Sequence, residues 1–97
     1  MGKEAAIQTK IMKYLAGKGA VCNKTIGMGK AGWPDIIGVY KGRFIGIEVK
    51  QPGKKATKLQ EFKLAELKTA GAYVCVGVSV HEAQTLLAEI DKLDASL

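Results

Sequence analysis

The spacing of apolar residues divides the chain into segments of helical and strand character. Residues 3–18 carry apolar side chains at intervals of three and four positions, which is typical of an amphipathic helix. Residues 20–26, 35–40, 43–50 and 72–78 are short, largely apolar runs bounded by Gly, Pro, Lys or Ser, which favours strands. We therefore expect one N-terminal helix and four strands from periodicity alone.

Two further helices are predicted from their N-terminal signals. Thr57 followed by Gln60 has the form of a capping box, and the helix that it opens should run to about Ala70. Ser79 followed by Glu82 is a second capping box. It opens a final helix whose inward positions would be Val80, Ala83, Leu86, Leu87, Ile90 and Leu93. The resulting order, α-β-β-β-α-β-α, predicts an α/β fold with a mixed central sheet flanked by helices.

The second and third strands should form a β-hairpin. Residues 41–42 are a two-residue connection, and its Gly can adopt the positive φ that tight hairpin turns require. If Tyr40 faces Arg43, counting back places Asp35 opposite Glu48, with Cβ atoms roughly 5 Å apart. The register therefore brings two carboxylates together.

Both faces of this hairpin are apolar. Ile37, Val39 and Phe44 lie on one face, and Ile36, Ile45, Ile47 and Val49 lie on the other. A strand set that is apolar on both faces must be covered on both faces. We therefore expect helices on each side of the sheet.

The paired acids define the candidate chemistry. Like charges placed opposite each other destabilise a sheet, so a cation should lie between Asp35 and Glu48. Lys50 is on the same face as Glu48. Two carboxylates, the Val49 carbonyl and waters form an oxygen shell suited to Mg²⁺ or Mn²⁺. Such an ion activates a water and polarises a phosphate, while Lys50 orients that water or stabilises the developing charge.

Length and composition limit the class of protein. The chain has 97 residues, 47% of them hydrophobic, which predicts a single globular domain over residues 1–97. No apolar run approaches the ~18 residues of a membrane span, and the N-terminus lacks a signal-peptide core. We therefore expect no membrane partner and an intracellular location, in the cytoplasm of a bacterium or of a virus-infected host cell. Cys22 and Cys75 should be reduced, buried thiols.

Charge is distributed unevenly along the sequence. Residues 1–68 contain 14 Lys/Arg and 5 Asp/Glu, whereas residues 69–97 contain 1 and 4. A basic surface of this kind favours a polyanionic partner, although lysines also keep small domains in solution. The lysines expected to contact nucleic acid are Lys24, Lys30, Lys54, Lys55 and Lys58.

Two other motifs exclude alternative chemistries. Residues 27–32 match GxGxxG but lead into a strand, whereas a dinucleotide site requires a helix there. We interpret this segment as a basic loop against a phosphate backbone, or as a plain connector. His81 is the only histidine, so one chain cannot build a histidine-based triad or a multi-histidine zinc site.

The residues around the acids resemble a known family. Gly32-Trp33-Pro34-Asp35 and Glu48-Val49-Lys50 give the spacing PD-x12-E-V-K, preceded by a strand and followed by a helix and a strand. This pattern resembles the PD-(D/E)XK nuclease superfamily, which has a restriction-endonuclease-like fold. Within that superfamily the chain looks like a small stand-alone VRR-NUC domain, the virus-type replication-repair nuclease.

The resemblance implies roles for individual residues. Asp35 and Glu48 would be metal ligands, Val49 would contribute its carbonyl, and Lys50 would be the catalytic lysine. Glu4 would match the family's acid on the first helix and join the metal ligands and catalytic groups. Gln60 would match the family's catalytic glutamine. Glu4 also suits any helix N-terminus, and Gln60 also suits a purely structural capping box.

The family resemblance implies a Mg²⁺- or Mn²⁺-dependent, structure-specific DNA endonuclease. Stand-alone members look like homodimers that act on branched DNA such as four-way (Holliday) junctions. The alternative is a non-enzymatic nucleic-acid-binding or accessory protein on the same fold. A protein-interaction module is a third possibility, but it leaves the charge asymmetry unexplained.

Overall fold

The computed structural model describes residues 2–26 and 31–95. Its elements are α1 (Lys3–Gly17), β1 (Val21–Lys24), β2 (Ile36–Tyr40), β3 (Arg43–Val49), α2 (Lys58–Thr69), β4 (Tyr73–Gly77) and α3 (Val80–Ala95). The predicted order α-β-β-β-α-β-α is confirmed. Each strand is shorter than expected, and the first, predicted over residues 20–26, is reduced to four residues.

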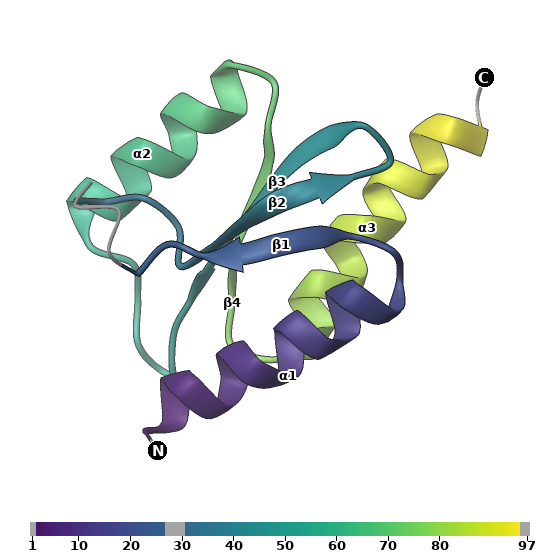
Figure 1. Cartoon of the computed structure of the whole chain (residues 1–97). Helices are drawn as coiled ribbons and strands as arrows, with labels where there is room; N and C mark the ends of the chain where they lie inside the picture. The colour runs from purple at the N-terminus through teal and green to yellow at the C-terminus, as the bar shows by residue number, and fades with distance from the viewer. Residues whose placement is uncertain (1, 27–30, 96–97) are drawn as a thin grey trace.

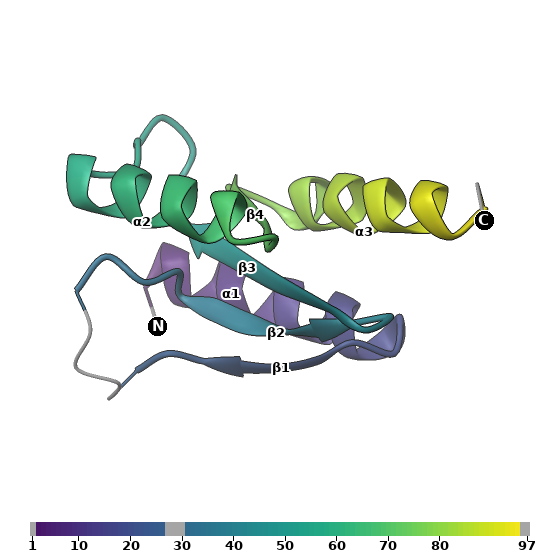
Figure 2. The same cartoon turned by 90° about the horizontal axis from the view of Figure 1, so that it is seen from above.

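The four described strands form one mixed sheet in the order β1-β2-β3-β4 (Figure 1). β1, β2 and β3 pair antiparallel, whereas β3 and β4 pair parallel. Parallel neighbours need a long crossover connection, and α2 supplies it. Figure 2 shows β1 at the edge of the sheet farthest from α2 and α3.

The hairpin between β2 and β3 has the predicted register. Lys41 and Gly42 both have positive φ, at 49° and 77°, as a two-residue type I′ turn requires. Tyr40 pairs with Arg43, and the ladder continues to Ile36 opposite Ile47. Asp35 and Glu48 are the next residues along each chain. The turn therefore sets the position of the two acids at the other end of the hairpin.

The core lies on the sheet face covered by α1 and α3. Its fully buried apolar side chains come from both helices and from β2 and β3, and include Ile11, Leu15, Ile36, Ile45, Ile47, Val49, Leu86, Leu87 and Ile90. Burying each such side chain stabilises the fold by roughly 1.5–3 kcal/mol. This packing holds the strands that carry the acids.

α2 packs on the opposite face, so the expectation of helices on each side of the sheet is confirmed, although α2 covers only part of that face. Val21, Val39 and Phe44 point to this face and are 77%, 48% and 36% exposed. α2 packs against β4 and has no fully buried residue, so it leaves β1 and β2 uncovered. α2 connects β3 to β4, and a single helix about 10 Å across covers only about two strands that lie ~4.8 Å apart.

The structure also bears on smaller features of the sequence. Leu93 is 41% exposed and not inward, because the last turn of α3 extends past the sheet (Figure 1). Cys22 and Cys75 are free thiols as expected, but they are half-buried and not fully buried. His81 is exposed. Within residues 2–26 and 31–95, no helix has the length and apolar character needed to cross a membrane.

Candidate active site

Asp35 and Glu48 lie together where the β2–β3 ladder ends. The backbone N–H of Val49 donates a hydrogen bond to Asp35 Oδ2 at 2.8 Å, which ties the Asp35 side chain to β3. The Asp35 backbone is fixed from the other side, because its carbonyl accepts from the Thr25 N–H at 2.9 Å. The prediction that Asp35 and Glu48 are neighbours is confirmed, because each is the next residue past the Ile36–Ile47 pair and the Asp35 carboxylate acts directly on the Glu48 side chain.

Glu48 is the buried acid of the pair. Its side chain is 2% exposed, and Glu48 Oε1 has no hydrogen-bond partner among the described residues. Burial, and then the charge of Asp35, raises the pKa of Glu48 to about 7. A buried carboxylate with an unsatisfied oxygen is costly unless a cation or proton meets it. The Glu48 carboxylate is therefore suited to hold a cation.

Lys50 shares the face of Glu48, as alternation along a strand predicts. Lys50 Nζ lies 3.6 Å from Glu48 Oε2, and the lysine side chain is 16% exposed. The Lys50 backbone N–H donates to the Gly77 carbonyl at 3.0 Å, which anchors it beside β4. Its ammonium group therefore lies between the buried carboxylate and solvent.

Gln60 reaches the site from the first turn of α2. Gln60 Nε2 donates to Glu48 Oε2 at 2.9 Å. The same side chain completes the predicted capping box, because Gln60 Oε1 accepts from the Thr57 N–H at 2.8 Å. Gln60 can therefore both cap the helix and contact the site, because its Oε1 binds Thr57 and its Nε2 binds Glu48.

Other predicted residues lie outside this cluster of contacts. Glu4 is half-buried in the first turn of α1. In the described part of the chain, no three His, Cys, Asp or Glu side chains are grouped to hold a metal, so Glu4 does not complete a three-acid set. The ligand role of Glu4 and that of the Val49 carbonyl stay predictions.

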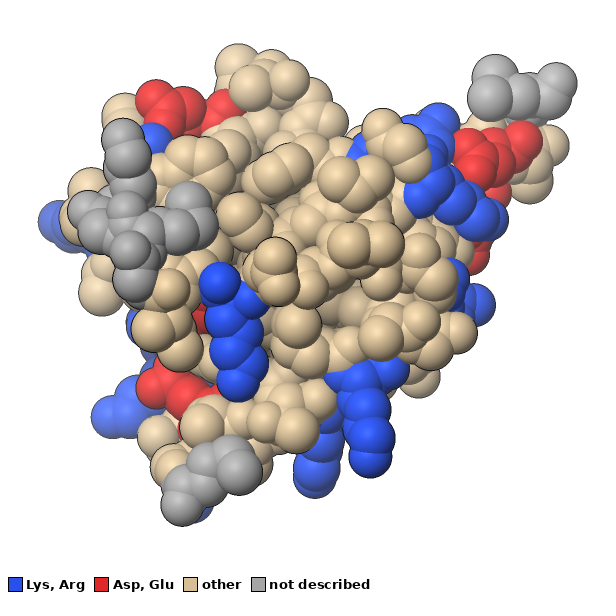
Figure 3. Space-filling model, in the orientation of Figure 1, with Lys and Arg blue, Asp and Glu red and all other residues tan. Residues whose placement is uncertain are grey.

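The predicted nucleic-acid lysines are spread over several segments. Lys24 ends β1, Lys54 and Lys55 follow a turn closed by a 3.0 Å bond from Lys54 N–H to the Gln51 carbonyl, and Lys58 begins α2. All four side chains are exposed. Lys30 lies outside the described residues. Figure 3 shows a face on which Lys and Arg surround a broad uncharged centre and form no single patch.

Sequence reasoning missed Thr25 and the interaction between Lys63 and Trp33. Thr25 Oγ1 donates to the Pro34 carbonyl at 2.8 Å, next to Asp35. Lys63 Nζ lies 5.4 Å from the centre of the Trp33 ring, so a cation–π contact links α2 to the segment before Asp35. The sequence contains no signal for either contact, because both depend on how distant segments are placed.

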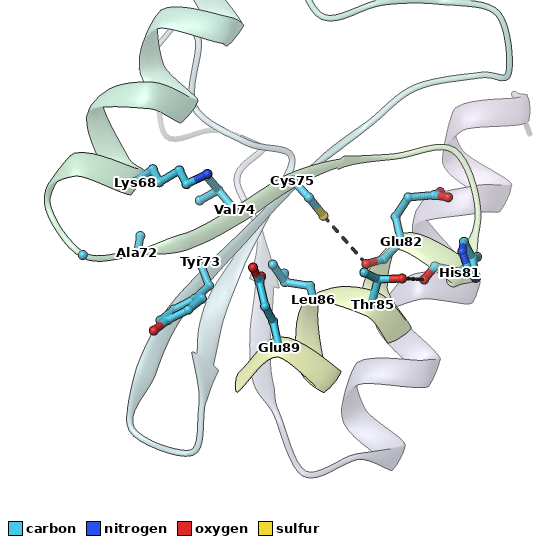
Figure 4. A pocket seen from close by; sticks show the side chains of 11 residues that line it. Lys68, Ala72, Tyr73, Val74, Cys75, His81, Glu82, Thr85, Leu86 and Glu89 are labelled. Atoms are coloured by element: carbon cyan, nitrogen blue, oxygen red, sulfur yellow. Dashed lines mark hydrogen bonds between the residues drawn. The ribbon is translucent and has the colours of Figure 1, made fainter. Parts of the chain in front are cut away.

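A separate cleft lies between β4 and α3, away from these acids (Figure 4). Cys75 lines it with its Sγ 4.0 Å from the Glu82 carbonyl. Burial raises the pKa of Cys75 to about 12, so at neutral pH it is a thiol and a poor nucleophile. None of the predicted site residues lines this cleft.

Comparison with known proteins identifies the fold. No protein-family profile matches the chain, and no curated protein sequence matches it. A solved structure described as a VRR_NUC domain superposes with a TM-score of 0.77 at 23% identity, covering 91% of this chain and 97% of that one. The chain has the fold of a VRR_NUC domain. The fold expected from the PD-x12-E-V-K resemblance is thus confirmed.

Proposed function

We propose that this chain is a Mg²⁺- or Mn²⁺-dependent DNA endonuclease that hydrolyses phosphodiester bonds. The observation that carries the proposal is the Glu48 carboxylate, which is buried beside Asp35 with Oε1 lacking a partner among the described residues. A structural ion pair would satisfy both oxygens. An oxygen left unsatisfied beside a second carboxylate fits a divalent cation that binds through oxygen. The VRR_NUC fold supports a nuclease reaction class.

The residues divide the reaction between them. Asp35 and Glu48 would hold the ion, with the Val49 carbonyl and Glu4 as the further ligands expected from the sequence. When bound, the ion supplies Lewis-acid polarisation of the phosphate and a more acidic water. Lys50 orients the attacking water or donates to the phosphate oxygens as the new O–P bond forms and the opposite P–O bond breaks. Gln60 holds Glu48 Oε2 from the α2 side.

Branched DNA, such as a four-way junction, is the substrate we propose, and a homodimer is the active form. One chain offers one such site, so cutting two related strands needs two copies. The uncovered strip of Val21, Val39 and Phe44 beside β1, the terminal strand of the described sheet, is an uncharged surface on which a second copy could pack. Exposed Lys24, Lys54, Lys55 and Lys58 would contact the DNA backbone, and Lys30 is proposed with them from the sequence.

The test is a cleavage assay on branched, flapped and linear DNA with Mg²⁺, with Mn²⁺ and with EDTA. We expect metal-dependent cutting that favours branched DNA, and a loss of at least ~10²-fold in Asp35→Ala, because an essential electrostatic group is removed. Asp91→Ala is the matched control, since it removes an acid at the far end of the hairpin. Asp35→Ala protein that cuts at the wild-type rate would overturn the proposal.

The same preparation tests the assembly and the alternative function. Light scattering should give a dimer at micromolar concentration, and DNA binding should weaken steeply with salt. Salt-sensitive binding to DNA without cleavage in any metal would instead support the non-enzymatic binding protein. Cleavage by a monomer, equal on branched and linear DNA, would leave a nuclease without the proposed branch selectivity.

A further inference from the structure

The first turn of α2 reaches the candidate site, whereas the rest of the helix packs on β4. None of its residues is fully buried, and Leu59 and Phe62 are 53% and 64% exposed. Its first turn, in contrast, bonds directly to the buried carboxylate through Gln60. Leu64 and Leu67 are half-buried, so packing on β4 also holds the helix. The first turn adds a specific polar link between α2 and the acid that it touches.

The capping box determines which atom of Gln60 faces Glu48. Gln60 Oε1 accepts from the Thr57 N–H at 2.8 Å, and Thr57 Oγ1 accepts from the Gln60 N–H at 3.2 Å. An amide side chain has one oxygen and one NH₂ group. With the oxygen committed to Thr57, the NH₂ group faces Glu48 Oε2. If the amide were flipped, its NH₂ group would face the Thr57 N–H, donor against donor. Its oxygen would face Glu48 Oε2, acceptor against acceptor.

We propose that Thr57 is a positioning residue for the metal centre, acting through Gln60 on Glu48. The inference rests on the proposed function, because it assumes that Glu48 binds the ion. Thr57 holds Gln60, Gln60 holds Glu48 Oε2, and Glu48 Oε1 is left for the ion. Groups that orient a metal ligand without touching the metal change its affinity substantially.

The chain contains a matched control for an ordinary helix cap. Ser79 Oγ accepts from the His81 N–H at 3.2 Å at the start of α3, and its described hydrogen bonds go to Glu82 and His81 and to none of Thr57, Gln60 and Glu48. Ser79→Ala therefore removes a helix cap without touching the Thr57–Gln60–Glu48 series. If Thr57 were only a cap, Thr57→Ala and Ser79→Ala would have the same consequences.

The experiment measures Mn²⁺ affinity by calorimetry, with melting temperatures in EDTA. We expect Gln60→Ala to weaken Mn²⁺ binding about 10-fold and Thr57→Ala about 3- to 10-fold. Thr57→Ser should keep the wild-type affinity because it keeps the hydroxyl. Ser79→Ala should lower the melting temperature and leave Mn²⁺ affinity unchanged. In the Gln60→Ala background, Thr57→Ala should add nothing, since the two act in series.

A second measurement does not need metal. NMR of the Gln60 side-chain NH₂ in metal-free protein should show slow hydrogen exchange in wild type and faster exchange in Thr57→Ala. Unchanged Mn²⁺ affinity and unchanged exchange in Thr57→Ala, with wild type binding Mn²⁺, would overturn the positioning role alone. Wild-type protein that binds no Mn²⁺ and cuts no DNA would overturn the proposed function, and the positioning role with it.

Discussion

The two ends of the β2–β3 hairpin differ in how their charged side chains are paired. At the turn, Lys41 Nζ lies 2.7 Å from Asp91 Oδ1, and Arg43 Nη1 lies 2.7 Å from Asp94 Oδ1. Tyr40 also donates to Asp91 at 2.8 Å. At the other end, Asp35 and Glu48 adjoin, and among the residues the structure describes the cation paired with Glu48 is Lys50, at 3.6 Å.

The pKa shifts follow this difference. The hydrogen bond from Lys41, and then that from Tyr40, lowers the pKa of Asp91. Burial and Asp35 raise the pKa of Glu48 to about 7. At the turn, ion pairs attach the hairpin to α3. At the open end, the pKa of the Glu48 carboxylate is raised, so its charged form is disfavoured. A raised pKa of this kind is characteristic of a site that binds or reacts.

The largest expected effect comes from replacing Glu48, the acid whose charged form is disfavoured at the open end of the hairpin. Because the folded-state pKa of Glu48 is raised from 4.5 to about 7, its stabilising contribution is complete below pH ~4.5 and is lost as the pH rises through ~7. Glu48→Gln in EDTA should therefore be more stable than wild type at pH 8, by about 1–3 kcal/mol. The smaller value applies if water screens the carboxylate.

Denaturant unfolding of both proteins from pH 4 to pH 8 checks this expectation. The lowered pKa of Glu82 and Asp91 gives the opposite trend, with stability lost toward acid pH, in both proteins alike. The difference between wild type and Glu48→Gln therefore isolates Glu48. A stability difference that does not change with pH would mean that folding does not raise the pKa of Glu48.

A somewhat smaller effect should come from metal. Wild type at a Mg²⁺ concentration ten times the dissociation constant should gain about 1.4 kcal/mol of unfolding free energy, because the ion binds only the folded pair. Asp35→Asn should lose this gain. In EDTA it should be at least as stable as wild type, because it removes a like charge while an amide oxygen can still accept from the Val49 N–H. Melting curves with Mg²⁺ and with EDTA provide the measurement.

The sequence predicted the open end of the hairpin better than its surroundings. The Lys41-Gly42 turn and strict alternation fix the register, so the Asp35–Glu48 contact follows from counting. The extent of α2 coverage does not follow from any local pattern. Val39 and Phe44 have the apolar character of covered positions but are exposed, because the connection from β3 to β4 limits where α2 can lie.

The same distinction holds for the site: its residues within the hairpin could be predicted, and the contacts that distant segments make with it could not. Asp35, Glu48 and Lys50 are close in a hairpin, and strand geometry brings them together. Thr25, which directly follows β1, donates to the Pro34 carbonyl, and this contact depends on the β1–β2 pairing, which no short turn specifies. The sequence around Gln60 is consistent with both a capping role and a site role, and the structure shows that one side chain has the contacts of both.

The smallest effect is expected at the turn end, where charges are compensated and close to water. The Asp94 side chain is 36% exposed and that of Arg43 is 26% exposed, so solvent screens their attraction. Asp94→Ala should lower the melting temperature by less than about 4 °C, and 0.5 M salt should reduce that loss further. It should leave Mn²⁺ affinity and cleavage at wild-type values, because Asp94, on α3, contacts Arg43 at the start of β3, whereas Glu48 lies near the other end of that strand. A large loss of metal binding in Asp94→Ala would mean that the two ends of the hairpin are energetically coupled through β3, and that the separation of structural and functional charge does not hold.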